Sequence, residues 1–227
     1  MTGTIVNAVL VIIGGLIGLL FKKGLPKKLT DAVMTGIALC TIYIGIDGCL
    51  EGKNPLITVI AIAVGAVVGT LLDLDGRLSS LGDAVERKFK KNTEEKVSLA
   101  EGFVSSSLLF CVGAMAIMGS LQSGLAGNHE TLYTKSVMDF ISSIVFASSL
   151  GIGVLFSGLA VFVYQGAITL LAGFLSPLLS DVAVAEMTCA GSILLIGLGL
   201  NLLGITKIKI MNYIPAIFLP ILLCMFM

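Results

Sequence analysis

The chain is a succession of apolar runs, and most of them are long enough to cross a lipid bilayer. A bilayer core is about 30 Å thick, so a helix that crosses it needs about 20 apolar residues. The runs are continuous and lack the alternation of β-barrel strands, which predicts an all-α polytopic transmembrane helix bundle. Outside the longest stretch, the expected spans are residues 3–21, 31–50, 56–72, 99–121, 182–203 and 211–227.

The longest apolar stretch covers residues 136–174 and contains a single charged residue, Asp139. It is too long for one crossing and about right for two. Residues 148–153 read Ser-Ser-Leu-Gly-Ile-Gly, and the glycines allow a tight turn there. We therefore interpret the stretch as a helical hairpin, which brings the number of spans to eight. The alternative is one tilted helix followed by irregular chain, which gives seven.

The positions of the basic residues favour the eight-span arrangement. There, loops 22–28, 73–98 and 204–210 share one side and hold all of the 14 lysines and arginines except Lys53 and Lys135. In the seven-span alternative, the basic residues of loop 204–210 change sides. Because basic loops are retained in the cytoplasm, we expect both termini to lie outside.

One polar segment, residues 77–91, interrupts the single transmembrane domain that residues 1–227 are expected to form. Its apolar residues recur at helical spacing, and basic residues crowd its end. We expect a cytoplasmic amphipathic linker that lies on anionic headgroups. A helix that docks a regulatory partner is the alternative. The apolar positions are Leu78, Leu81, Val85 and Phe89, and the basic ones are Arg87, Lys88, Lys90 and Lys91.

A similarity between the two ends of the chain predicts an internal repeat. Gly15-Leu-Ile-Gly-Leu-Leu followed by Pro26 aligns with Gly166-Ala-Ile-Thr-Leu-Leu followed by Pro177. If spans 1–3 recur as spans 6–8, the two copies are inverted, because five spans separate their first helices. Inverted repeats are common in secondary transporters. Chance similarity between leucine- and glycine-rich helices is the alternative.

Composition agrees with a membrane protein and argues against other classes. The chain is 56% hydrophobic and 12% charged, whereas a soluble domain is about 25% charged. The formal net charge is zero, so charge indicates no nucleic-acid partner. The sequence has no nucleophile–base motif, metalloprotease motif or glycine-rich phosphate loop, so we expect no enzymatic activity and no cofactor. The five cysteines lie in or beside apolar runs and are expected to be small buried residues.

Three carboxylates inside apolar runs are the leading functional candidates: Asp47, Asp139 and Glu186. We expect no lysine or arginine inside a span to neutralise them. A buried carboxylate without a partner must be protonated, bind a cation or face water. The alternative is that all three carboxylates reach the outer membrane interface.

Hydroxyl groups are expected to accompany Asp139, on its own helical face and from the span at 99–121. Oxygen-rich groups beside a carboxylate suit Na⁺ or a proton-coupled polar solute. Serines also pack as small residues between membrane helices, which is the alternative. The candidate residues for substrate or ion binding are Asp139, Ser142, Ser143, Asp47, Glu186, Ser105, Ser106 and Ser107.

Several glycine- and leucine-rich motifs resemble the YdfK/YqgA family of bacterial inner-membrane proteins. They are Thr4-Ile-Val-Asn7-Ala, Gly14-Gly15-x-x-Gly18, Ile44-Gly45-Ile46 and Gly65-x-x-x-Gly69-x-x-Leu72-x-Leu74-Asp75. The resemblance extends over the whole chain and implies a location in the bacterial inner membrane. The function of that family is unknown, although its members are often labelled possible transport proteins. The resemblance supplies no binding residues.

These observations together lead to the expectation of a secondary transporter for a small polar solute or ion, coupled to H⁺ or Na⁺. The expected partners are the lipid bilayer, the solute or a monovalent cation, and further copies of the chain, since Gly14-x-x-x-Gly18 could bring helices close together. The alternatives are a membrane scaffold that signals through segment 77–91, and a passive channel.

Overall fold

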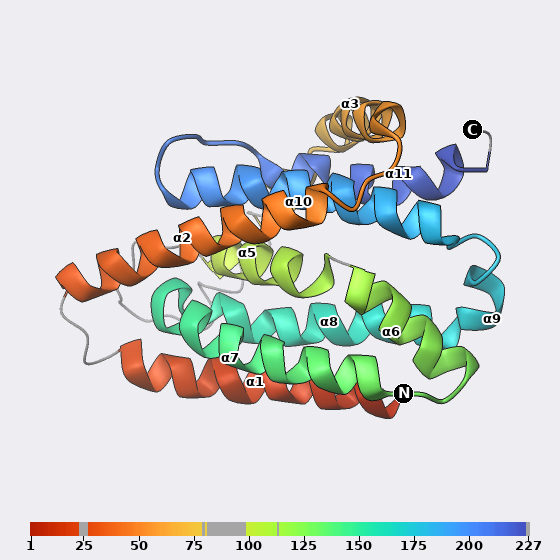
Figure 1. Cartoon of the computed structure of the whole chain (residues 1–227). Coiled ribbons are helices and arrows are strands. Elements are labelled where there is room, and N and C mark those ends of the chain that lie inside the picture. The colour runs from red at the N-terminus through yellow and green to blue at the C-terminus, as the bar shows by residue number, and fades with distance from the viewer. Residues whose placement is uncertain (23–26, 79, 81–98, 113, 226–227) are drawn as a thin grey trace.

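A computed structural model of the chain describes residues 1–22, 27–78, 80, 99–112 and 114–225, and within them every regular element is helical (Figure 1). The helices are α1 (Thr2–Lys22), α2 (Lys27–Cys49), α3 (Pro55–Leu71), α5 (Leu99–Cys111), α6 (Ala114–Leu125), α7 (Glu130–Leu150), α8 (Gly153–Leu170), α9 (Ala172–Leu175), α10 (Asp181–Leu202), the short 3₁₀ helix η1 (Ile210–Tyr213) and α11 (Pro215–Leu223). The prediction of an all-α fold is confirmed over these residues.

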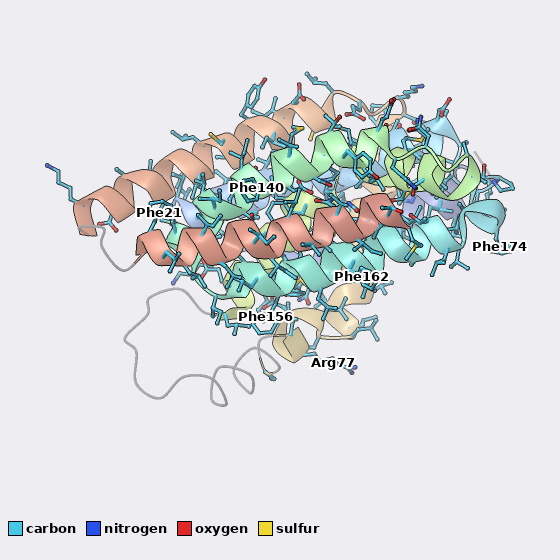
Figure 2. The ribbon with its side chains drawn as sticks, turned by 90° about the horizontal axis from the view of Figure 1, so that it is seen from below. Phe21, Arg77, Phe140, Phe156, Phe162 and Phe174 are labelled. Carbon is cyan, nitrogen blue, oxygen red and sulfur yellow. The ribbon has the colours of Figure 1, made fainter. Side chains whose placement is uncertain are left out.

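Helices from the two halves of the chain pack in pairs. α1 lies along α7 and α8, as Figures 1 and 2 both show, while α2 packs on α10 and α3 packs on α11. Gly14 and Gly18 make the α1–α7 approach possible, because a Cβ at either position would collide with Ser143 Oγ or the Ile144 carbonyl oxygen. The Gly14-x-x-x-Gly18 face is therefore occupied inside the chain.

The expected break in residues 136–174 is confirmed. α7 ends at Leu150 and α8 begins at Gly153, and Gly151 between them has φ +79°, which favours glycine. The helix that precedes the break starts earlier than predicted, at Glu130. Residue Lys135, assigned to a loop from the sequence, therefore lies inside α7.

The single span predicted at 99–121 is instead two helices. α5 ends at Cys111 and α6 begins at Ala114, and segments Leu99–Cys111 and Met115–Leu125 are inclined to each other by 61°. An uninterrupted apolar run does not reveal such a bend, because hydropathy reports only the length of the run. The break matters because it lies beside the candidate site described below.

Three described helices are long and apolar enough to cross a membrane: Thr2–Phe21, Gly153–Leu170 and Asp181–Leu202, with a fourth if the bent α5–α6 pair counts as one span. Shorter apolar helices cover Met34–Cys49, Pro55–Leu71 and Ile210–Leu223. Large apolar side chains lie at the periphery, among them Phe21, Phe162 and Phe174 (Figure 2). An apolar surface of this kind fits lipid contact. The count of eight spans and the inverted repeat remain predictions.

The amphipathic segment predicted at 77–91 lies outside the described residues, except for Arg77, Leu78 and Ser80. Arg77 marks its beginning in Figure 2.

Candidate functional site

A cavity of about 370 Å³ lies between α2, α7, α10 and the α5–α6 break. Leu109, Val112 and Met115 form part of its apolar wall beside the break. Side chains that are far apart in the sequence line this one cavity, which is partly open to the surface. Its charged and hydroxyl-bearing lining residues are Tyr43, Asp47, Glu51, Lys135, Asp139, Ser142, Thr188 and Ser192.

A buried ion pair lies at the inner part of this cavity. Lys135 Nζ is 2.6 Å from Asp139 Oδ2 and 2.8 Å from Oδ1, and the side chains are each 8% exposed. The two residues are one helical turn apart on α7, the spacing at which side chains meet. The expectation that no basic residue inside a helix neutralises the carboxylates is therefore wrong for Asp139. The spacing of four residues between Lys135 and Asp139 is the sequence signal that could have revealed the pair.

Asp139 is also held from α1, in a contact that the sequence did not predict. Asn7 Nδ2 donates to Asp139 Oδ2 at 3.0 Å and to Gln165 Oε1 of α8 at 3.3 Å. Thr4 and Thr169 form a further contact between α1 and α8, with their hydroxyl oxygens 3.4 Å apart. All four side chains are buried. Asn7 thus holds the Asp139 carboxylate from α1 and is itself bonded to Gln165 of α8.

Asp47 and Glu51 form an exposed acidic rim where α2 ends. Glu51 lies just beyond the helix, and its backbone N–H donates to the Gly48 carbonyl at 3.3 Å. Partial burial, and to a lesser extent the nearby Asp47 carboxylate, raise the pKa of Glu51. When all of its charged groups are ionised, the cavity holds the carboxylates of Asp47, Glu51 and Asp139 and the ammonium of Lys135. The negative charges outnumber the positive one, so the cavity attracts cations.

Glu186, the third predicted carboxylate, lies elsewhere and serves as an anchor for α3. Its Oε1 accepts from the backbone N–H groups of Lys53 and Asn54 at 2.6 and 2.7 Å. Its Oε2 accepts from the Thr58 hydroxyl at 2.8 Å. A buried carboxylate at a helix N-terminus is stabilised by such donors and by the helix dipole. Glu186 therefore binds α10 to the start of α3 and does not line the cavity.

The five predicted serines are divided among different surroundings. Ser142 lines the cavity with Asp139. Ser143 Oγ donates to the Phe140 carbonyl at 2.8 Å, and Ser106 Oγ donates to the Gly102 carbonyl at 2.7 Å. Ser105 and Ser107 line two other cavities, and within the described residues their hydroxyls have no hydrogen-bond partner. The structure therefore places Ser142 beside Asp139 and the other four serines away from the cavity.

Similarity to known proteins agrees with this membrane-protein architecture. Residues 2–225 match the family described as "Protein of unknown function (DUF554)". The chain is 34% identical over 224 residues to "Uncharacterized membrane protein YdfK" of Bacillus subtilis (strain 168), covering 97% of this chain and 94% of that protein. It is 27% identical over 219 residues to "Uncharacterized protein YqgA" of Escherichia coli (strain K12), covering 96% and 93%. No solved structure matches the chain. Because the match spans nearly the whole sequence, the chain belongs to the DUF554 family, and the predicted resemblance to YdfK and YqgA is confirmed.

Proposed function

We propose that this protein is a secondary transporter of a small polar solute or ion, coupled to H⁺ or Na⁺, with Asp139 as its principal binding carboxylate. The observation that carries the proposal is the cavity that joins the exposed rim at Asp47 and Glu51 to the buried Lys135–Asp139 pair. The name of the Bacillus subtilis relative supports a membrane protein. Ionisable groups inside a membrane protein generally mark paths for ions and solutes.

The chemistry of the cavity suits a hard cation or a cation-accompanied solute. Carboxylate and hydroxyl oxygens are the ligands that such ions prefer, and Asp139, Ser142 and Ser192 offer them along the wall. Lys135 already occupies both oxygens of Asp139. An entering cation and the Lys135 ammonium therefore compete for the same carboxylate. A proton on Asp139 has the same effect as the cation, since it also weakens the ion pair.

The arrangement in the membrane that we propose has eight spans, in the bacterial inner membrane. The first residue and the end of α11 lie toward the same end of the helices in Figure 1, as an even number of crossings requires. In this arrangement, both termini and the rim at Asp47 and Glu51 face outside. The cavity then receives its cation from the outer side.

Flux measurements with purified protein in proteoliposomes test the proposal. A pH-sensitive dye trapped inside reports H⁺ movement when Na⁺, K⁺ or candidate solutes are added outside. We expect at least one of these gradients to drive H⁺ or solute movement in the wild type, and Asp139→Asn to abolish it. Asp181→Asn, the same change at an exposed position outside the cavity, should retain it. Absence of flux for every gradient, or equal flux in the Asp139 variant, would refute the proposal.

A further inference from the structure

A second polar cavity, of about 180 Å³, lies between the N-terminal half of α5 and the C-terminal half of α10. Its lining includes the carboxylates of Asp75 and Glu101, the Ser105 hydroxyl and the Asn201 amide. None of these side chains lines the first cavity. Glu101 is exposed and Asp75 is partly exposed, so this cavity reaches the surface of the protein by a separate route.

α10 contributes lining residues to both cavities. Thr188, Ser192 and Leu195 line the first cavity, and Leu198 and Asn201 line the second. Leu195 and Leu198 are three residues apart, which makes them neighbours on the surface of the helix. α10 therefore passes from the first cavity to the second near these two leucines.

α5 also contributes lining residues to both cavities. Val112 and Leu109 line the first cavity, and Ser105 and Glu101 line the second. These residues follow each other at intervals of three or four, on one side of the helix. The cavities thus lie end to end along the seam between α5 and α10.

Buried leucines lie where the two sets of lining residues meet along this seam. Leu108, Leu195 and Leu198 are 4%, 1% and 4% exposed and belong to one buried cluster, against which Val104 and Leu109 pack. The hydroxyl of Ser105 is buried next to these leucines and has no hydrogen-bond partner among the described residues. Because an unsatisfied buried hydroxyl is costly, this group calls for water or a polar ligand in the second cavity.

We propose that the second cavity is the opposite-side vestibule of one pathway for hydrated cations, closed in this structure by the layer of Leu108, Leu195 and Leu198. The proposal deepens the transporter function and rests on it. Both vestibules carry carboxylates, which fits a cationic cargo at either end. The bend of 61° between Leu99–Cys111 and Met115–Leu125 lies beside the layer.

Labelling by a charged, membrane-impermeant thiol reagent in right-side-out and inside-out vesicles tests the pathway. Single cysteines replace Ser192, Ser105 or Asn201 in a full chain whose five native cysteines have been changed to alanine. We expect Ser192→Cys to react from one side, and Ser105→Cys and Asn201→Cys from the other. Ile193→Cys is the matched control, because residue 193 is exposed on another face of α10 and is expected to face lipid. Reaction of positions 192 and 201 from the same side, or no reaction at 105 and 201, would overturn the proposal.

A second variant tests the layer itself. Leu195→Ser places a hydroxyl in the barrier, and we expect the passive leak of Na⁺ into proteoliposomes to rise at least tenfold. Leu194→Ser, the same change at the neighbouring buried leucine, is the control, since Leu194 lines neither cavity. Equal leaks in the two variants would contradict the proposed barrier.

If two-sided labelling is found without coupled flux in the wild type, the pathway is that of a passive channel and the transporter function fails alone. If coupled flux is found without two-sided labelling, the pathway proposal fails alone.

Discussion

Lys135 Nζ lies 2.6 Å from Asp139 Oδ2, one turn away on α7, and both side chains are buried. Removal of one charge from a buried pair leaves the other without compensation, at a cost of about 3–5 kcal/mol. Lys135→Met should therefore lower the free energy of unfolding by about this amount. Unfolding by denaturant in detergent micelles measures the change.

The control for that variant is Lys53→Met, because residue 53 is exposed and contributes only its backbone N–H to Glu186. We expect a change of less than about 0.5 kcal/mol there. The double variant Lys135→Met with Asp139→Asn should recover part of the lost stability, since no unpaired charge remains. If Lys135→Met is as stable as the control, the ion pair does not stabilise the fold.

A cation that binds Asp139 should raise the melting temperature of the wild type. A ligand that binds only the folded state, at a hundred times its Kd, stabilises by about 2.7 kcal/mol. Asp139→Asn keeps the shape of the side chain and leaves Lys135 without its partner, so we expect a lower melting temperature without Na⁺ and loss of the response to Na⁺. A melting series in Na⁺ and K⁺ at fixed ionic strength measures this difference. An identical response in wild type and variant would make Asp139 an ordinary packing residue.

The pH dependence of the acidic rim follows from Glu51. Partial burial, and then the Asp47 carboxylate, raise the pKa of Glu51, so its carboxyl remains protonated to a higher pH than a free glutamate. Cation affinity should fall as pH decreases through this raised value. Asp47→Asn removes the smaller cause and should lower the Glu51 pKa partway, while burial keeps it above its ordinary range. The ¹³C shift of the labelled Glu51 carboxyl reports this titration.

The raised pKa of Glu51 also determines how this residue changes the stability of the fold with pH. A carboxyl whose pKa is higher in the folded state takes up a proton on folding, so its contribution to stability is present at low pH and is lost as pH rises through the folded pKa. Glu51→Gln should remove this loss of stability at higher pH. Glu130→Gln, at an exposed helix start, is the comparison and should leave the loss in place. A Glu51 titration at the ordinary value would contradict the proposed influence of burial.

The sequence allowed the helical class and the turn near Gly151 to be predicted, because both follow from local composition. Segmentation by apolar runs placed Lys135 outside its helix, since a charged residue was taken as the end of a run. The hydrogen bond from Asn7 to Asp139 joins α1 to α7 and has no local signal. Glu186 was grouped with Asp47 and Asp139 because all three are acidic residues in apolar runs. Its donors are mainly backbone N–H groups of another segment, which residue types do not reveal.

Glu186 provides the test that separates an anchoring carboxylate from a binding one. Its two oxygens accept hydrogen bonds from Lys53 N, Asn54 N and Thr58 Oγ1, and the residue is fully buried. Glu186→Ala leaves these donors without partners, and each buried unpaired group costs about 1–3 kcal/mol. We therefore expect a loss of about 3 kcal/mol or more in the free energy of unfolding. Hydrogen exchange at the amides of Lys53 and Asn54 should accelerate.

The response to cations distinguishes the two roles of Glu186. Because Glu186 does not line the cavity, Glu186→Gln should keep the wild-type increase in melting temperature with Na⁺, even if its starting melting temperature is lower. Glutamine retains one acceptor oxygen and should lose less stability than alanine. Asp139→Asn, measured in parallel, should show the opposite pattern, with the Na⁺ response lost. If Glu186→Gln also abolishes the response while the exchange of the Lys53 and Asn54 amides stays slow, then Glu186 belongs to the binding site and its place at the start of α3 is not its main role.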